Sequence, residues 1–191
     1  MIEIRWHGRG GQGSFTAAKL LGIAASLYEG KHALAFPSFG PERRGAPVQA
    51  FTKIAGSKIH DRSEIKACDY MVFLDETLVE EGLLRDIKPG GKIVINSKHP
   101  GNYEGLQGYD ITTLDATSIA LEILKRPITN TAMLGAFIGV SGIVDIASAV
   151  KGMENYLEQG ILEKNIRVLQ RSYELCRGDN LPGASETGGA V

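Results

Sequence analysis

Apolar and polar residues alternate at the start of this chain and then recur at helical spacing. Residues 2–7 alternate with a period of two, which predicts a β-strand. From Ser14, a residue suited to cap a helix, apolar residues fall on one helical face as far as Tyr28, and Gly30 ends the segment. The chain therefore opens with a strand and a helix, joined by the glycine-rich residues 8–13.

Strand-like and helix-like segments continue to alternate along the rest of the chain. Further strands are predicted at residues 32–36, 48–55, 70–75, 92–97 and 109–115. Further helices are predicted at residues 75–87, 116–124, 130–144 and 163–176. Two of the strands are nearly continuous apolar runs, as is typical of interior parallel strands. The pattern predicts an α/β fold, namely a Rossmann-like three-layer open sheet, mostly parallel, with helices on both faces.

Two segments depart from the pattern of a self-sufficient domain. The first strand places Glu3, Arg5 and His7 on one side, so we expect that face to meet water or another subunit. The helix at 130–144 is apolar and contains three glycines, which allow very close packing. It is interpreted either as a central buried helix of this domain or as a contact with a partner subunit.

Length and composition indicate an ordinary globular polypeptide. The 191 residues are 43% hydrophobic and 23% charged, and no window approaches the roughly 18 apolar residues of a membrane span. We expect one domain over residues 1–177, and a disordered tail over the small, polar residues 178–191. No signal peptide is evident, so a cytoplasmic protein is expected, with neither a membrane nor nucleic acid among its partners.

The cysteines and histidines give no sign of a metal centre. Cys68 and Cys176 lie far apart and outside any C-x-x-C spacing, so this chain is not expected to hold an iron–sulfur cluster. The four histidines form no cluster of ligands, and no metal site is expected. No pairing of a nucleophile with a base is evident either, so we assign no catalytic residue.

The glycine-rich connection is the first candidate site. Its stretch "GRGGQG" has the spacing G-x-G-x-x-G, and it lies between a predicted strand and the start of a predicted helix, where free amides favour an anion. The second strand, "HALAFPSF", lacks the acidic residue that a nicotinamide-binding unit requires, which disfavours NAD or FAD. A purely structural turn is the alternative. The candidate binding residues here are Gly8, Arg9, Gly10, Gly11, Gln12 and Gly13.

A second loop, "FGPERRGAP", presents Arg43 and Arg44 between glycines and prolines. Loops at the carboxyl ends of parallel strands line one crevice, so this loop is expected to face the glycine-rich connection. Residues 1–66 hold ten basic and five acidic residues, against eleven and seventeen in residues 67–191. A phosphorylated ligand would suit the basic part, and arginine binds phosphate well. Alternatively, the two arginines pair with Glu42 or with carboxylates of a neighbouring subunit.

Three stretches taken together resemble a known family. "HGRGGQG" at 7–13, "FPSFGPERRGAPVQAF" at 36–51 and "NTAMLGA" at 130–136 are similar to gamma subunits of the 2-oxoacid:ferredoxin oxidoreductases, most closely those of the pyruvate enzymes. The likeness extends over residues 1 to about 177. One departure is Ala46, where many relatives have a second glycine.

The resemblance implies a heterotetramer that converts pyruvate, CoA and oxidised ferredoxin to acetyl-CoA, CO2 and reduced ferredoxin, and the reverse. It implies thiamine diphosphate in the alpha and beta subunits, iron–sulfur clusters in the delta subunit, and ferredoxin as the electron carrier. This chain alone would bind no cofactor, and its two loops would help to bind CoA as a substrate. Two alternatives stay open. The complex could act on a branched-chain 2-oxoacid or on indolepyruvate, or the loops could only dock a non-catalytic assembly subunit onto its partners.

Overall fold

The computed structural model describes residues 1–38 and 44–178, and its described part is built around one six-stranded sheet. The strands are β1 (Ile2–Arg9), β2 (His32–Pro37), β3 (Pro47–Ala55), β4 (Cys68–Phe73), β5 (Ile87–Asn96) and β6 (Asp110–Leu114). Their order across the sheet is β2-β3-β1-β4-β5-β6. β1, β4, β5 and β6 pair in parallel, whereas β3 runs antiparallel to both β1 and β2. The sheet is therefore mixed but mostly parallel.

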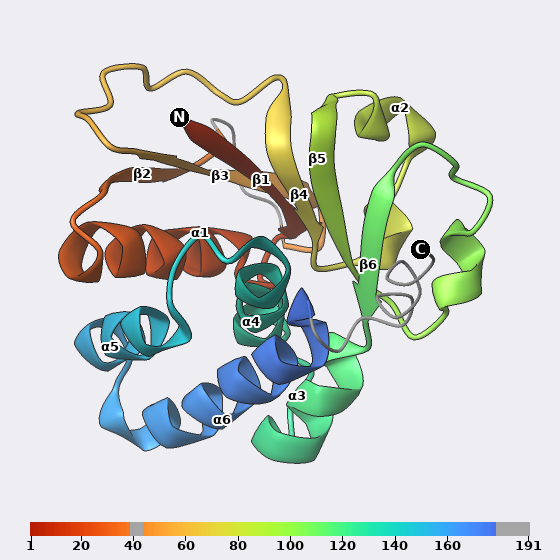
Figure 1. Cartoon of the computed structure of the whole chain (residues 1–191). Helices are drawn as coiled ribbons and strands as arrows, with labels where there is room; N and C mark the ends of the chain where they lie inside the picture. The colour runs from red at the N-terminus through yellow and green to blue at the C-terminus, as the bar shows by residue number, and fades with distance from the viewer. Residues whose placement is uncertain (39–43, 179–191) are drawn as a thin grey trace, which may run out of the picture.

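Helices lie on both faces of the sheet but in very unequal amounts. The long ones gather on one face (Figure 1): α1 (Ser14–Ile23) with a π-helical turn η1 (Ala24–Tyr28), α3 (Ala116–Leu124), α4 (Asn130–Ser141), α5 (Ile146–Tyr156) and α6 (Gln159–Cys176). Among the described residues, the other face carries only the short helices η2 (Glu76–Leu78), α2 (Glu81–Leu84) and η3 (Pro100–Tyr103). The α/β fold predicted from the sequence is confirmed.

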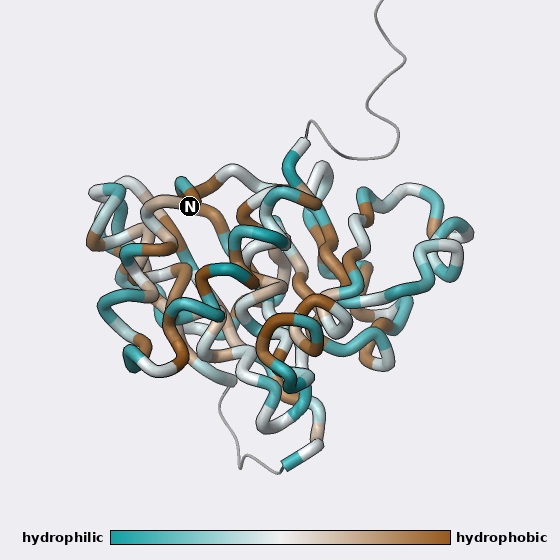
Figure 2. The backbone as a smooth tube through the Cα atoms, turned by 90° about the horizontal axis from the view of Figure 1, so that it is seen from below, coloured by the Kyte–Doolittle hydropathy of each residue, from teal (hydrophilic) through white to brown (hydrophobic). Residues whose placement is uncertain are grey.

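The larger core lies between the sheet and the long helices. Trp6 of β1 and Tyr70 of β4 both pack on Phe137 of α4, with ring centroids 5.3 Å apart in each pair. Figure 2 looks onto this helix layer, where hydrophobic and hydrophilic segments alternate along the chain as amphipathic helices require. α4 is the exception, since its residues from Thr131 to Ile138 are all buried.

Glycines allow α4 to lie directly against the backbone of α6. A Cβ added to Gly135 would collide with the carbonyl oxygen of Leu169, and one added to Gly139 would lie 2.8 Å from that of Tyr173. Such distances are too short for any side chain larger than hydrogen. The interpretation of this segment as a central buried helix of the domain is therefore confirmed.

The polar side of β1 is buried within this chain. Arg5 and His7 are each only 3% exposed. The guanidinium of Arg5 donates to the Asp86 carboxylate at 2.9 Å, to the Lys66 carbonyl at 2.9 Å and to Nε2 of His7 at 3.2 Å. The prediction that this face meets water or another subunit is therefore wrong for Arg5 and His7, because residues distant in the sequence cover it.

Some element boundaries also differ from the sequence pattern. Gly13, in a left-handed conformation, takes the N-cap position of α1 that Ser14 was expected to occupy. The helix predicted at 75–87 is broken into η2 and α2, and β5 begins at Ile87, before the strand predicted at 92–97. α5 was not predicted. The single-domain boundaries stay a prediction, and the tail predicted to be disordered lies, from residue 179, outside the described residues.

Candidate functional site

The glycine loop, residues 8–13, joins β1 to α1 at the edge of the sheet where the parallel strands end. Gly11 and Gly13 have φ angles of 95° and 82°, a left-handed conformation that other residues adopt only with strain. Gly13 also has no room for a side chain, because the amide of Asn130, at the start of α4, lies 2.6 Å from where a Cβ would be. The loop thus needs glycine both for its turn and for its contact with α4.

An ion pair fixes the loop to the neighbouring strand. Nε of Arg9 donates to Oδ2 of Asp75 at 3.0 Å, just after β4. Its two terminal nitrogens donate to the Thr77 hydroxyl at 2.7 Å and to the Gly45 carbonyl at 3.2 Å. The sequence predicted that Arg9 donates hydrogen bonds to a ligand. In the structure, all three nitrogens of its guanidinium already donate hydrogen bonds within the protein. The main role of Arg9 is therefore to position the loop, and only the N–H groups that these bonds leave over face solvent.

Gln12 and Thr77 add further hydrogen bonds that hold the glycine loop against Asp75. The side chain of Gln12 accepts from the Arg9 amide at 2.7 Å and donates to Asp75 at 3.1 Å. Thr77 donates to the other Asp75 oxygen from its amide and its hydroxyl, at 3.0 and 2.6 Å. Burial alone would raise the pKa of Asp75, but the hydrogen bonds from Thr77, Gln12 and Arg9 outweigh it and lower that pKa below its ordinary value. The ionised carboxylate therefore holds the loop in one shape.

Asp75 and Thr77 are site residues that sequence reasoning missed. The available signal was the acidic residue that directly follows the apolar stretch "YMVFL". An acidic group at the carboxyl end of an interior strand lies in the crevice where ligands bind in α/β sheets. The pairing with Arg9 spans 66 residues and leaves no trace in local sequence.

The second predicted loop lies against the first, as expected. The Gly10 amide donates to the Ala46 carbonyl at 2.8 Å, and the Gly45 amide donates to the Gly10 carbonyl at 3.0 Å. These bonds place Arg44 beside Gly10 in a short bridge. Arg44 is exposed, and its guanidinium forms no hydrogen bond or ion pair with the residues that the structure describes. Arg43, the other predicted arginine, lies outside the described residues.

The start of α1 offers further donors beside these loops. The amides of a helix's first turn have no acceptors within the helix, and here no side chain caps them. Ser14 is 3% exposed, and its buried hydroxyl has no hydrogen-bond partner among residues 1–38 and 44–178. The free amides and the exposed guanidinium of Arg44 together form a set of donors suited to an anion.

A cleft of about 530 Å³ opens on the other side of Gln12, above the ends of β4, β5 and β6. Its lining includes the carboxylates of Asp75, Glu76 and Asp115 but only one basic residue, Lys98. Glu76 accepts from the Ser97 hydroxyl at 2.5 Å. Like charges repel, so this negative lining disfavours phosphate, whereas the exposed guanidinium of Arg44 would attract it.

The thiols of this chain do not fit an iron–sulfur cluster. Cys68 and Cys176 are buried in the cores on opposite faces of the sheet. Burial raises the pKa of Cys68 to about 12 and that of Cys176 to about 11, so both stay protonated rather than becoming thiolate ligands. Within residues 1–38 and 44–178, no three His, Cys, Asp or Glu side chains are grouped to hold a metal ion, and no helix is long and apolar enough to cross a membrane.

Comparison with known proteins places this geometry in a family. Residues 3–175 match the family described as pyruvate ferredoxin/flavodoxin oxidoreductase. The chain is 48% identical to the pyruvate synthase subunit PorC of Methanothermobacter thermautotrophicus, over 91% of this chain and 95% of that protein. It is 43% identical to the common gamma subunit of the pyruvate/ketoisovalerate oxidoreductases of Pyrococcus furiosus, over 91% and 96%.

A solved structure agrees with the sequence matches. The crystal structure of the pyruvate oxidoreductase subunit PORC of Thermotoga maritima superposes with a TM-score of 0.78 at 38% identity, covering 91% of this chain and 95% of that one. The family match spans all six strands almost completely and both described parts of the candidate site. The chain therefore belongs to the pyruvate ferredoxin/flavodoxin oxidoreductase family.

Proposed function

We propose that this chain is the gamma subunit of a pyruvate synthase, a complex that interconverts pyruvate, CoA and oxidised ferredoxin with acetyl-CoA, CO2 and reduced ferredoxin. The support is the family match over residues 3–175 and the likeness to PorC subunits over almost their whole length. Thiamine diphosphate and iron–sulfur clusters belong to the alpha, beta and delta subunits in this proposal, with ferredoxin as the electron carrier. Thiamine diphosphate supplies the carbanion chemistry.

This chain's own contribution is to bind CoA through its phosphates. The phosphates meet the amides at the start of α1 and the guanidinium of Arg44, while Arg9, Gln12 and Asp75 keep the loop in shape. Arg43, from the same loop as Arg44, is proposed as a second phosphate ligand. The observation that carries this proposal is the exposed Arg44, unpaired among the described residues and held by backbone hydrogen bonds against a rigid glycine loop.

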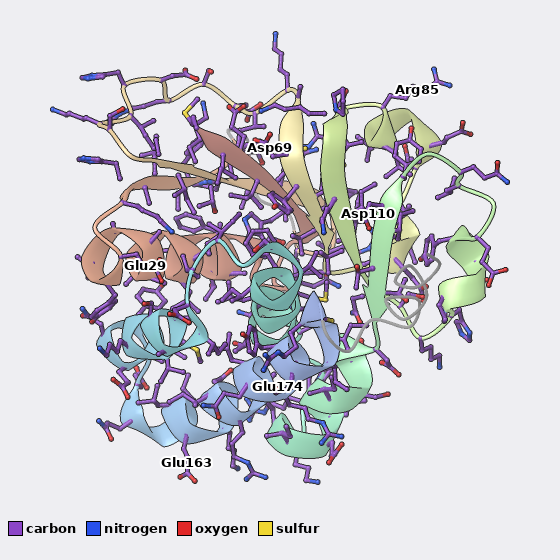
Figure 3. The ribbon with its side chains drawn as sticks, viewed as in Figure 1. Glu29, Asp69, Arg85, Asp110, Glu163 and Glu174 are labelled. Atoms are coloured by element: carbon purple, nitrogen blue, oxygen red, sulfur yellow. The ribbon has the colours of Figure 1, made fainter. Side chains whose placement is uncertain are left out.

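Steady-state kinetics of the assembled complex test the CoA proposal. A hydrogen bond to a charged group contributes about 1.5–3 kcal/mol, so Arg44→Ala should raise the KM for CoA roughly tenfold or more and leave the KM for pyruvate unchanged. Arg43→Ala and the double variant extend the test to the second ligand. The matched control is Arg85→Ala, because Arg85 is an exposed arginine that points into solvent beyond α2 (Figure 3).

Two outcomes would contradict the proposal. Normal assembly with unchanged CoA dependence removes these arginines from the CoA site. Failed assembly favours the alternative in which the loops dock a non-catalytic subunit onto its partners.

A second candidate is the same subunit in a complex for another 2-oxoacid. The Pyrococcus furiosus relative is named as common to pyruvate and ketoisovalerate oxidoreductases, which indicates that one gamma subunit serves more than one substrate. Substrate choice is then set by the thiamine-containing subunits, and a branched-chain 2-oxoacid or indolepyruvate stays possible here. Comparing these 2-oxoacids with pyruvate in the assembled complex separates the candidates. The cytoplasmic location expected from the sequence stays a prediction.

A further inference from the structure

A groove of about 430 Å³ lies on the helix layer, and it borders the same loop between α3 and α4 that also lines the acidic cleft. The end of α3, the start of α4, the first turns of α6 and the loop between α3 and α4 form its walls. Asn130 separates the groove from the glycine loop, since it lines the groove and also packs on Gly13. We call this site the α3–α4–α6 groove.

The apolar part of the groove is open to solvent. Leu124 and Leu157 lie in its wall, and Ile128 and Ile161 stand on it with 43% and 49% of their surfaces exposed. Large aliphatic side chains exposed side by side over a hollow are typical of surfaces that another molecule covers. Burying such a surface contributes to binding in proportion to the apolar area removed from water.

The charged part of the groove is positive and lacks a counterion. Arg126 and Lys164 line it and are exposed, and the side chain of neither residue forms an ion pair or hydrogen bond with the described residues. No Asp or Glu lines the groove, and Glu163, next to Lys164 in sequence, points away from the body of the protein (Figure 3). The start of α4 adds the positive end of a 12-residue helix, whose N-cap residue makes no side-chain cap.

By contrast, several basic side chains at the sheet have acidic partners. Arg5 pairs with Asp86, Arg9 with Asp75, and Lys88 with Glu3 and Asp69. The groove differs in combining unpaired cations with exposed isoleucines. Its complement is a surface that carries carboxylates beside aliphatic side chains.

We propose that the α3–α4–α6 groove docks a segment of a partner subunit that presents aliphatic side chains next to one or two carboxylates. The inference rests on the proposed function, in which this chain works inside a complex. A protein segment fits better than a small anion, because a small anion would pair with Arg126 and Lys164 but leave Ile128 and Ile161 in water. The carboxylates of the segment pair with the two cations while its aliphatic side chains cover the isoleucines.

Charge reversal in the co-expressed complex tests this inference. The double variant Arg126→Glu with Lys164→Glu should reduce the amount of this chain retained with the alpha, beta and delta subunits at least tenfold at a fixed salt concentration. The double variant Ile128→Ser with Ile161→Ser should reduce it at every salt concentration. The control is Lys58→Glu with Arg62→Glu, an identical change of charge at two exposed residues before β4. Far-UV circular dichroism and thermal melting of each isolated variant establish that it is folded.

The outcomes separate the inference from the proposed function. Full retention of both folded groove variants overturns the inference while the proposed function stands. Normal assembly with a raised KM for CoA also overturns it, because the groove would then be part of the CoA site. If the groove variants abolish self-association of the isolated chain, the occupant is a second copy and the inference is again wrong. If the unmodified chain does not co-purify with the other subunits, the proposed function fails and the inference fails with it.

Discussion

The two faces of the sheet are stabilised by different physical means, although they share the same strands. On the helix face, β1 presents Ile4 and Trp6, both fully buried against apolar side chains. On the other face the same strand presents Arg5 and His7, equally buried but held by an ion pair and hydrogen bonds. Close packing against long helices holds the first face together, whereas charge neutralisation by loops and short helices holds the second.

The polar face shows how a buried charge can be tolerated. The side chain of Lys53 on β3 is only 1% exposed, and its ammonium group lies 2.5 Å from a carboxylate oxygen of Asp61 and 3.9 Å from one of Glu3. Asp61 itself is half exposed, so the pair connects the interior to water. A buried cation needs such a partner because an unpaired charge in the interior is very costly.

The strongest test of the helix face is Gly135→Ala. The new methyl group would collide with the backbone of α6, which cannot turn aside as a side chain would. We expect the free energy of unfolding to fall by roughly 3 kcal/mol or more, at the upper end of overpacking effects. Chemical denaturation measures it. Gly82→Ala in α2 is the matched control, since nothing lies within 4 Å of its added Cβ and its stability should change little. An equal loss in both variants would contradict the packing argument.

The polar face should make stability depend on pH through His7. Burial, and next the positive charge of Arg5, lower the pKa of His7 from 6.5 to about 3. Below pH 6.5 the unfolded chain therefore binds a proton that the folded chain refuses, and stability is lost as the pH falls towards 3. At pH 5 the loss from this residue is about 2 kcal/mol.

Denaturation at several pH values checks this expectation. His7→Gln should flatten the decline in stability between pH 7 and pH 5, whatever its effect at neutral pH. His60→Gln, at an exposed histidine, should keep the slope of the unmodified chain. An unchanged slope in the His7 variant would show that its ring accepts a proton without unfolding.

The smallest effect is expected where the buried charge itself is removed. Lys53→Met replaces the ammonium by an apolar group of similar length and leaves Asp61 solvated, so the free energy of unfolding should change by under about 1 kcal/mol. Asp61→Asn should lower the melting temperature more, because it leaves Lys53 buried without its nearest carboxylate. The reverse order in thermal melting would mean that the pair is held by packing of the lysine chain and not by charge.

The sequence predicted the helix face well because burial there is one-sided and periodic. Ala17, Ala18 and Leu21 recur at helical spacing, and all three are buried. The polar face could not be predicted in the same way. The period of two identified Arg5 and His7 as facing one side, but their cover comes from Asp86, 81 residues away from Arg5. The period of a strand indicates which of its side chains lie on the same face of the sheet, but not which distant residues cover that face.

The candidate site was predictable in its backbone and less so in its side chains. The glycine spacing indicated a turn that only glycine permits, and Gly11 and Gly13 have the left-handed conformation this implies. The facing of the two loops followed from the rule that such loops line one crevice. The ion pair between Arg9 and Asp75 could not be inferred, because the residues around Arg9 in the sequence do not indicate which acceptor its guanidinium contacts.

The contact between α4 and α6 also constrains how the chain is made on the ribosome. Gly139 packs on Tyr173, which is synthesised 34 residues later. At about 5–20 residues per second, α4 waits roughly two to seven seconds before its closest neighbour exists. During that interval a helix that is apolar on every side has one face uncovered. α6 therefore closes this part of the core, and the time between the synthesis of α4 and that of α6 is when the nascent chain most needs protection from aggregation.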